Sequence, residues 1–442
     1  MRLVSSFNHL IIMSANQRLQ ELFLIAYILT GTLLMSSCKK DPTLPVLTTD
    51  EAIEITTNSA TISGNVTEDG GAEITARGIC WGTVTMPTLS DNFKPSGTGP
   101  GKFSCVISEL EPNTEYYVRA FAENRVGIAY GNEVTFKTGI ATPSVTTGQV
   151  TDITLNSAVC AGTVINSGGA PVIEKGICWS QAPDPDLDDS HASVSAGTDT
   201  YTCTLTGLSS GSRYYARAYA KNEGGTAYGE QVVFSTKVLD IEGNIYGTVC
   251  IGNQVWMKEN LKTTKFNDNS ALPLIEDDST WVHLETPAYC WLNHEIQYKN
   301  IYGALYNWYT VETGKLCPAG WHVPDDNEYK TMEISLGMSV EQAELWEWRG
   351  TDEGYKMKST TTWNNNGNGS NSSGFNGLCG GYRFGQTGAF YALGILTYWW
   401  SSDPDKNDNA QAVYRRLDFD NSRVHRSVTS KRGGKYIRCI KD

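Results

Sequence analysis

The sequence has few of the residue patterns that hold metal ions. It contains no HExxH motif and no CxxC pair, and its six histidines are scattered, at positions 9, 191, 283, 294, 322 and 425. Structural and catalytic zinc sites usually show one of those spacings. We therefore expect no zinc site.

Positive charge is also scarce. Lysine and arginine together number 35 against 48 aspartates and glutamates, which leaves a formal net charge of −13. Proteins that bind nucleic acid or anionic lipid through charge carry an excess of basic residues. This balance argues against nucleic acid and against a charged lipid surface as partners.

Long apolar runs are missing, except for one short run near the N-terminus. Residues 22–35 form that run, with Arg18 before it and two serines and Cys38 after it. A membrane-spanning helix needs about 20 residues, so this order is typical of a secretory signal. The cysteine makes it similar to a bacterial lipoprotein signal, and an ordinary signal peptide with a chance cysteine is the alternative.

The lipoprotein resemblance implies that residues 1–37 are removed and that Cys38 is lipidated. The protein would then sit at the outer membrane or cell surface of a Gram-negative bacterium, with the lipid as its only membrane contact. The polar, proline-containing residues 38–45 would follow as a tether. Either Met1 or Met13 is the start of translation.

A repeat occupies the next part of the chain. "SATISGNV" returns as "SAVCAGTV", "RGICW" as "KGICW" and "YYVRAFAEN" as "YYARAYAKN", each pair 98 residues apart, as Gly78 and Gly176 are. Short alternating runs rich in Thr, Val, Ile and Tyr, separated by Gly, Asn, Pro and Ser, predict strands throughout. About 100 residues of such strands suits a seven-stranded sandwich. We predict two all-β domains, at 46–138 and 143–237.

These repeats resemble fibronectin type III domains. In each repeat a leucine, Leu110 or Leu208, stands six residues before a tyrosine, as in the tyrosine corner of that fold. The resemblance implies spacer domains with Trp81 and Trp179 in their cores. Alternation along one strand would point a set of side chains inward, namely Tyr116, Val118, Ala120 and Ala122.

The cysteines follow the repeat. Cys80 and Cys105 return as Cys178 and Cys203. Export permits a disulfide within each sandwich, but the strand alternation would turn Cys80 away from the core, so both pairings stay open. Cys160 has no counterpart and is expected to be a reduced core residue.

From residue 239 onward, aromatic residues increase and helical patterns appear. Three helices are predicted, over 300–314, 323–337 and 339–348, and two strands, over 412–419 and 435–440. The second helix begins with Asp325 and Glu328 at the spacing of a capping box. Helices followed by antiparallel strands indicate an α+β domain.

Six motifs in this region carry a family resemblance. In order, they are "IYGTVCIGNQVWMKENLKTTKFNDNSALP", "YGALYNWYTV", "GKLCPAGWHVPDDNEY", "SGFNGLCGGYR", "YWWSSD" and "KYIRCIKD". With them, residues 239–442 resemble the Fibrobacter succinogenes major paralogous domain family. That family is similar to C-type lectin-like domains and more distantly to the formylglycine-generating fold. The expected architecture is therefore multidomain: two all-β fibronectin type III-like sandwiches followed by an α+β C-type lectin-like domain.

The lectin-like resemblance implies a disulfide between Cys317 and Cys439, which stand at the positions of the bonded pair in that fold. Closing so long a loop would stabilise the domain by about 4 to 5 kcal/mol in the chain-entropy model. His322 in "CPAGWHVP" is then a packed, hydrogen-bonded residue. It would not form a catalytic pair with Cys317, because the disulfide removes the thiol.

A ligand site is expected in the amide-rich and aromatic segment before the last strands. Aromatic rings offer flat faces to sugars, while amide and guanidinium groups offer hydrogen bonds. The candidates are Trp363, Asn365, Asn366, Tyr382, Arg383, Tyr391, Trp399 and Trp400. Since neighbours in a strand face opposite ways, we expect at least one of Trp399 and Trp400 to bind ligand or to lie under a loop.

The sequence predicts either no cofactor or a bound calcium ion. Asp403, Asp405 and Asp408 lie in one loop, and carboxylate oxygens suit that ion. The sugar-binding tripeptides of calcium-dependent lectins are absent from the sequence. A calcium ion in this loop therefore remains an alternative to a C-terminal domain that binds no metal.

Three functions fit these patterns. The first is a lipid-anchored, adhesin-like binding protein that displays a lectin-like head, for a glycan or protein ligand, on two spacers. The second is a structural component of a surface coat or assembly. The third is an enzyme of the formylglycine-generating kind, which needs two active cysteines. Cys379 could supply one and no second stands at a matching position, so we expect no enzyme, although a fold does not fix function.

Overall fold

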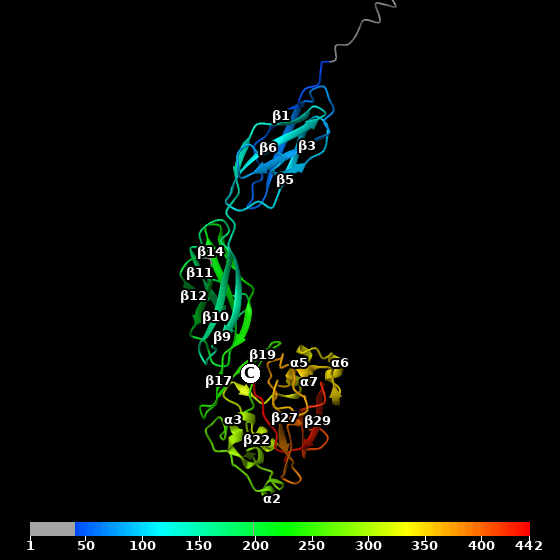
Figure 1. The fold of residues 1–442 in the computed structure, drawn as a ribbon. Helices are drawn as coiled ribbons and strands as arrows, with labels where there is room; N and C mark the ends of the chain where they lie inside the picture. Colours follow the sequence, from blue (N-terminus) through cyan, green and yellow to red (C-terminus); the bar gives the residue numbers. More distant parts are fainter. Residues whose placement is uncertain (1–39, 198) are drawn as a thin grey trace, which may run out of the picture. The chain divides into compact units, whose positions relative to one another are not determined.

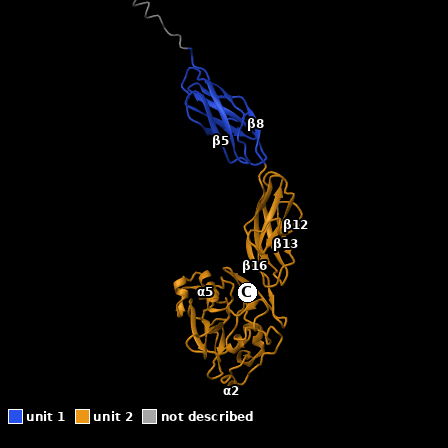
Figure 2. Cartoon of the chain, turned by 180° about the vertical axis from the view of Figure 1, so that it is seen from behind, with its two compact units in different colours: residues 1–139 blue, residues 140–442 orange. Residues whose placement is uncertain are grey.

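The structure is a computed structural model that describes residues 40–197 and 199–442. The predicted signal sequence and the lipidation site at Cys38 lie outside the described residues. The chain divides into two compact units, one ending at Gly139 and one running from Ile140 to Asp442 (Figure 2). Within the described residues, no helix combines the length and the apolarity needed to cross a membrane.

The first unit is a β-sandwich of two sheets around one core (Figure 1). One sheet has the order β1-β2-β5, with strands Val46–Thr49, Ala60–Glu68 and Gly101–Ile107. The other has the order β4-β3-β6-β7, with β8 also paired to β6; its strands are Asn92–Pro95, Ala76–Gly82, Glu115–Asn124, Gly127–Tyr130 and Val134–Lys137.

The second unit begins with a sandwich of the same topology. Its smaller sheet has the order β13-β10-β9, with strands Thr200–Leu205, Ala158–Asn166 and Ser144–Thr151. Its larger sheet has the order β12-β11-β14-β15, with β16 also paired to β14; the strands are Ser190–Val194, Glu174–Ser180, Arg213–Asn222, Gly225–Tyr228 and Val232–Ser235. The repeated sequence thus forms repeated strands, and the all-β prediction for both repeats is confirmed.

Side-chain alternation sets the inner face of each sandwich. The predicted inward set on β6 is buried, with exposed fractions of 7% for Tyr116 and 0% for Val118, Ala120 and Ala122. The Tyr116 hydroxyl accepts a hydrogen bond from the Glu111 N–H at 3.0 Å, and the Tyr214 hydroxyl accepts one from the Ser209 N–H at 2.9 Å. Each tyrosine therefore fixes the loop that precedes its own strand.

The repeated cysteines are free thiols. Cys80 and Cys178 are buried, and their sulfur atoms donate to the carbonyls of Pro87 at 3.3 Å and Pro185 at 3.2 Å. Cys80 faces away from the sandwich core, as expected, since Ile79 and Trp81 belong to that core and Cys80 does not; the segment after β3 nevertheless covers it. Neither open disulfide is formed. Cys160 is buried and free, as expected.

The C-terminal domain, residues 238–442, is built on two larger sheets. The six-stranded sheet has the order β24-β29-β28-β27-β25-β26; its strands are Glu347–Arg349, Val424–Ser430, Gln411–Asp418, Leu396–Pro404, Gly380–Arg383 and Phe390–Leu393. The four-stranded sheet has the order β19-β20-β30-β23, with strands Thr248–Ile251, Gln254–Met257, Ile440–Lys441 and Trp321–His322. Two short pairs complete it: β17 at Val238–Leu239 with β18 at Ile245–Tyr246, and β21 at Tyr289–Cys290 with β22 at Leu305–Tyr306.

Helices in this domain are short. They are α2 (Asp278–Trp281), η1 (Leu292–His294), η2 (Ile296–Tyr298), α3 (Lys299–Tyr302), α4 (Trp308–Val311), α5 (Asp326–Ser335), α6 (Val340–Ala343) and α7 (Glu353–Met357). The capping box of α5 is confirmed, since the Asp325 side chain accepts from the Glu328 N–H and the Glu328 side chain accepts from the Asp325 N–H.

The other two predicted helices are wrong in extent. The 300–314 segment splits into α3 and α4, because Gly303 with a φ of 83° ends the first and the Asn307 side chain caps the second. The helix expected over 339–348 is capped by Ser339 but ends at Ala343, and Glu347 with a φ of 63° then opens β24. The predicted strand over 412–419 matches β28, whereas most of 435–440 is irregular core chain.

Candidate functional site

The two adjacent tryptophans of β27 lie in different cores. Trp399 and Trp400 are both 0% exposed, and they belong to the two separate hydrophobic clusters on opposite faces of the six-stranded sheet. The Trp399 indole N–H donates to the Asn260 side chain at 2.8 Å, and that of Trp400 to the Tyr306 carbonyl at 2.9 Å. Both residues are buried core residues, so the structure corrects their choice as ligand-binding candidates and favours the other expectation, that the chain covers them.

Two more candidates are buried. Trp363 is 5% exposed and its indole N–H donates to the Gly377 carbonyl at 3.0 Å. Arg383 is 0% exposed and donates to the Gly388 carbonyl and the Asp278 carboxylate, each at 2.7 Å. The prediction that these two side chains contact ligand is therefore wrong, because all their polar groups serve the fold.

Asn365 and Asn366 remain exposed candidates. Both have positive φ angles, of 51° and 62°, in an exposed turn. The backbone N–H of the preceding Asn364 donates to the Gly394 carbonyl at 2.8 Å. This bond ties the amide-rich loop to the turn between β26 and β27, at the edge of the six-stranded sheet.

Tyr382 and Tyr391 are brought together, one on each of two paired strands. They oppose each other across β25 and β26, with ring centroids 6.0 Å apart. Tyr382 is half-buried, while Tyr391 is 46% exposed. Phe384 contacts both rings edge-on, at 6.4 and 6.2 Å.

These tyrosines begin a line of rings that crosses the whole sheet, one ring from each strand. We call it the aromatic strip: Tyr391, Tyr382, Tyr398, Tyr414, His425 and Trp348, from β26 to β24. The successive centroid distances are 6.0, 4.9, 4.9, 5.8 and 4.8 Å. Tyr414 and His425 are buried, whereas Tyr382, Tyr398 and Trp348 are half-buried. A ligand can therefore reach the strip most readily at its Tyr391 end.

Two cations lie against the strip. The Lys435 ammonium is buried beneath it, 4.1 Å from the Tyr398 ring centroid and 5.3 to 5.4 Å from those of Tyr414 and Tyr382. Burial lowers the pKa of Lys435 to about 7, helped by the nearby Arg416 charge. Arg416 itself lies over the Tyr398 ring at 5.7 Å. Arg416 thus places a positive charge beside the strip, and Lys435 adds a second one as the pH falls below about 7.

Carboxylates balance part of this charge. Arg416 pairs with Asp418, two residues on in the same strand. The Nε2 atom of His425 lies 2.7 Å from the Glu347 carboxylate, and burial is the main cause that lowers the pKa of His425. Stacking surfaces beside paired charges suit a polar ligand that has flat apolar faces.

The proposed calcium loop is satisfied internally. Asp403 accepts a 2.6 Å hydrogen bond from the Asp326 N–H, and Asp408 accepts from the Ala410 N–H and the Gln411 side chain at 2.9 and 2.8 Å. Asp405 accepts from the Asn407 N–H. No group of three or more His, Cys, Asp or Glu side chains in the described chain is placed to hold a metal ion. The structure therefore contradicts a shared calcium site at Asp403, Asp405 and Asp408.

The predicted disulfide is confirmed. Cys317 and Cys439 are bonded across 122 residues of chain. His322 lies 2.9 Å from the Glu328 carboxylate and 2.6 Å from that of Asp442. The hydrogen bonds to these carboxylates raise the pKa of His322 to about 9, so the residue is a structural cation.

Two of the three free thiols of this domain are poorly suited to nucleophilic chemistry. Cys290 and Cys379 are 0% exposed, and burial raises the pKa of both, that of Cys290 to about 12. A reactive cysteine needs a stabilised thiolate in an accessible position. The geometry gives no support to a formylglycine-generating reaction at Cys379.

The sequence reasoning missed five members of the site, namely Trp348, Tyr414, Arg416, His425 and Lys435. A signal for some of them was present, because alternation in "AVYRRLDF" places Tyr414 and Arg416 on one face and alternation in "TYWW" places Tyr398 and Trp400 on one face. The sequence does not show that these strands pair with each other and with β29 and β24.

Solved structures show partial similarity to the chain. The sensor domain of the anti-sigma factor RsgI4 of Pseudobacteroides cellulosolvens is 25% identical over 22% of this chain and 96% of that chain, with a TM-score of 0.18. A longer form of it is 26% identical over 22% and 90%, with a TM-score of 0.17. The FN1–FN3 domains of chicken CNTN1 are 14% identical over 51% and 78%, with a TM-score of 0.28. No curated protein matches the chain.

The C-terminal domain has a family match. The family model described as the Fibrobacter succinogenes major domain matches residues 249–441, and this match supports the resemblance of that region to the family.

Proposed function

We propose that this protein is a carbohydrate-binding protein of the cell surface. A lectin-like C-terminal domain would bind the glycan, and two fibronectin type III-like sandwiches would act as spacers. The observation that carries the proposal is the open end of the aromatic strip, where Tyr391, Tyr382 and Tyr398 lie within 6.0 Å of their neighbours at the sheet edge. Such rings can stack on the apolar faces of sugars, and the exposed amides Asn365 and Asn366 follow Asn364, whose N–H is bonded to Gly394 at the same edge.

The test is a glycan array probed with the full-length protein, with and without calcium. We expect binding that does not depend on calcium, because the three loop carboxylates are already hydrogen-bonded. Tyr391→Ala and Tyr382→Ala should each weaken binding about tenfold or more, which corresponds to about 1.4 kcal/mol.

A matched control variant is Tyr355→Ala. Tyr355 is 45% exposed, like Tyr391, but lies on α7 rather than in the strip. Its loss should leave glycan binding unchanged. Binding that survives both strip variants, or that Tyr355→Ala weakens equally, would refute the site.

The runner-up function is a structural component of a surface coat, without a small ligand. Exposed apolar residues beside the strip favour it, since Leu393 is 38% and Ile395 is 43% exposed. This alternative would be favoured if the protein bound no glycan on the array and showed concentration-dependent self-association in sedimentation experiments.

The membrane attachment is a proposal that rests on the sequence. Cys38 follows the apolar run 22–35 in the order of a lipoprotein signal. In a Gram-negative host, Cys38→Ser should move the protein from the membrane fraction to a soluble fraction and remove the lipid mass. An unchanged fractionation would exclude lipidation at Cys38 as the anchor.

A further inference from the structure

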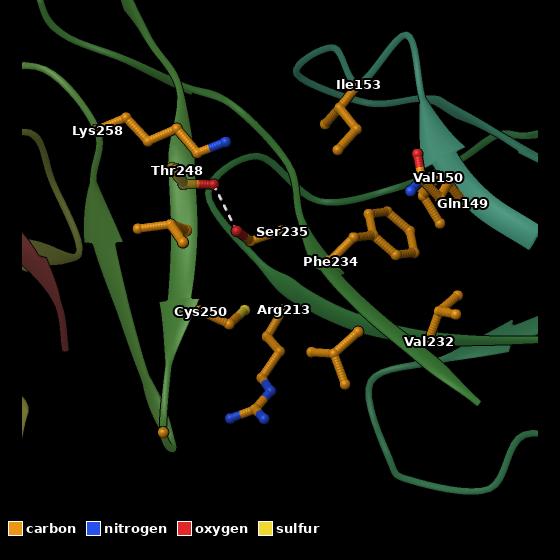
Figure 3. A pocket seen from close by; sticks show the side chains of 13 residues that line it. Gln149, Val150, Ile153, Arg213, Val232, Phe234, Ser235, Thr248, Cys250 and Lys258 are labelled. Atoms are coloured by element: carbon orange, nitrogen blue, oxygen red, sulfur yellow. Dashed lines mark hydrogen bonds between the residues drawn. The ribbon is translucent and has the colours of Figure 1, made fainter. Parts of the chain in front are cut away.

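A cavity of about 550 Å³ lies inside the second unit, where its sandwich meets the C-terminal domain (Figure 3). Strands β9, β14 and β16 supply one wall, and β19 with the residue after β20, Lys258, supplies the other. Sites for single small molecules typically measure about 300 to 1,000 Å³. The cavity is therefore of a size to hold one such molecule.

Hydrogen bonds fix the two walls to each other. The Thr248 hydroxyl of β19 donates to the Ser235 hydroxyl of β16 at 2.6 Å (Figure 3). It also lies 2.8 Å from the Thr236 carbonyl. The Lys441 ammonium donates to the Ser212 hydroxyl at 2.8 Å. Thr248 and Ser235 are both buried, so these bonds are shielded from water. The cavity is thus a preformed feature of this junction.

Two cations line this cavity without an acidic partner. Arg213 and Lys258 are lining residues, and among the thirteen described residues that line the cavity none is an aspartate or glutamate. The Arg213 Nε atom is buried and has no hydrogen-bond partner within the described chain. Arg213 lies over the Tyr215 ring at 5.2 Å, which orients its guanidinium group but provides no acceptor.

The two cations stand at different ends of the cavity, with the Lys258 ammonium beside Thr248 and the Arg213 guanidinium beyond Cys250 (Figure 3). Burial raises the pKa of the Cys250 thiol, and Arg213 and Lys258 both act against that rise. Leaving a buried nitrogen of a charged group unpaired costs free energy, which an anion in the cavity would recover. Phe234, Val150 and Val249 supply an apolar surface in the same cavity.

We propose that this cavity binds a small organic carboxylate with an apolar body. The carboxylate would pair with Arg213, whose buried Nε atom has no partner within the described chain, since a guanidinium group matches a carboxylate in a bidentate geometry. The apolar body would lie against Phe234 and its neighbouring valines. The site is separate from the aromatic strip and its occupancy does not depend on glycan binding.

The probe is 3-phenylpropionate, titrated calorimetrically into the full-length protein. The uncharged 3-phenylpropionamide tests the charge, and inorganic phosphate tests the apolar body. We expect both to bind at least tenfold more weakly than 3-phenylpropionate. Equal binding of the amide, equal binding of phosphate, or no binding of 3-phenylpropionate would overturn the proposal.

Variants locate the site. Arg213→Gln should weaken binding at least tenfold, whereas Arg125→Gln and Lys406→Gln, which remove exposed charges elsewhere, should not. Thermal unfolding of the ligand-free variants checks folding, and Arg213→Lys, which keeps the charge but loses the bidentate geometry and should also weaken binding, keeps the test decisive if Arg213→Gln does not fold. Retained affinity in a folded Arg213 variant would refute the assignment.

Cys250 gives an independent readout. It lines the cavity and is half-buried, whereas the other free cysteines of the described chain are buried. Bound 3-phenylpropionate should slow the alkylation of Cys250 by iodoacetamide. Mass spectrometry of the peptide that contains Cys250 measures the rate of this alkylation. Binding without protection of Cys250 would place the ligand elsewhere and overturn the proposal.

Discussion

His322 is held between two carboxylates, one from a helix and one from the end of the chain. Glu328 also caps α5, and Asp442 is the final residue. A histidine with a folded pKa of about 9 binds its proton more tightly than in the unfolded chain, where the pKa is about 6.5. Its contribution to stability is therefore full below pH 6.5 and is lost as the pH rises through 9.

His322→Gln should lower the free energy of unfolding by roughly 0.5 to 1 kcal/mol at pH 6, because the pair is partly exposed to solvent. At pH 10 the variant and the parent should differ much less. Urea unfolding at both pH values measures the difference. His283→Gln, an exposed histidine, is the control and should show no such change. An equal loss at both pH values would contradict the charged role.

Removing the disulfide should lower the free energy of unfolding by more than the His322 substitution does. Because Cys317 and Cys439 are 122 residues apart, their bond restricts the unfolded chain strongly. The double variant Cys317→Ala with Cys439→Ala should lose about 4 kcal/mol of unfolding free energy in denaturant titrations. Reductant should destabilise the parent by a similar amount and leave the double variant unchanged, since the other cysteines of the described residues are free. A reductant effect on the double variant would point to another disulfide.

Single residues also mark what the sequence reveals and what it does not. The capping box at Asp325 and the alternation of Trp399 with Trp400 are local properties, so both were readable. Whether a face is covered depends on segments far away in the chain. Trp400 is covered by residues such as Tyr306, and Arg383 is buried by the segment around Ile275, which no local pattern reports.

At the scale of elements, α5 is joined to the six-stranded sheet by a buried ion cluster. Glu333 of α5 is 0% exposed and lies 2.8 Å from Arg415 of β28 and 2.9 Å from Arg349 of β24. This carboxylate pairs with two buried guanidinium groups on the face opposite the aromatic strip, and Asp326 pairs with Arg415 as well, at 2.9 Å. Removing one member of such a cluster leaves uncompensated charge in the interior.

Glu333→Gln should therefore cost about 3 kcal/mol or more of unfolding free energy, which urea titration measures. Glu341→Gln, an exposed glutamate in the first turn of α6, is the matched control and should change stability by less than about 0.5 kcal/mol. A small effect at Glu333 would mean that water or another group compensates the arginines.

The aromatic strip shows why elements are harder to predict than residues. Its tyrosines lie on strands whose order in the sheet, β28-β27-β25-β26, follows no simple order along the chain. Alternation assigns each side chain to a face, but the pairing that aligns the rings comes from long-range contacts. The prediction of one helix over 300–314 was wrong for a related reason. Gly303 and the pairing of β22 with β21 interrupt the helix that the apolar spacing there predicts.

At the scale of the whole molecule, one difference between the repeats marks a domain junction. Asn113 in the first sandwich corresponds to Gly211 in the second, 98 residues later, and both have positive φ angles, of 53° and 60°. Conformation alone therefore does not require glycine at this place. A Cβ atom on Gly211 would lie 2.7 Å from the Trp321 ring of the C-terminal domain. The sequence signals this contact only as a departure from the repeat.

Gly211→Ala should loosen the second sandwich from the C-terminal domain, because Trp321 or the loop must move. Gly207→Ala is a matched control, since Gly207 has a similar φ of 71° but no atom within 4 Å of an added Cβ. Both variants carry backbone strain of roughly 1 kcal/mol, so the excess loss in Gly211→Ala reports the contact. In calorimetry we expect that excess to lower the transition of the second unit and to leave that of the first unit unchanged. Equal effects of the two substitutions would show that the contact with Trp321 does not hold the junction together.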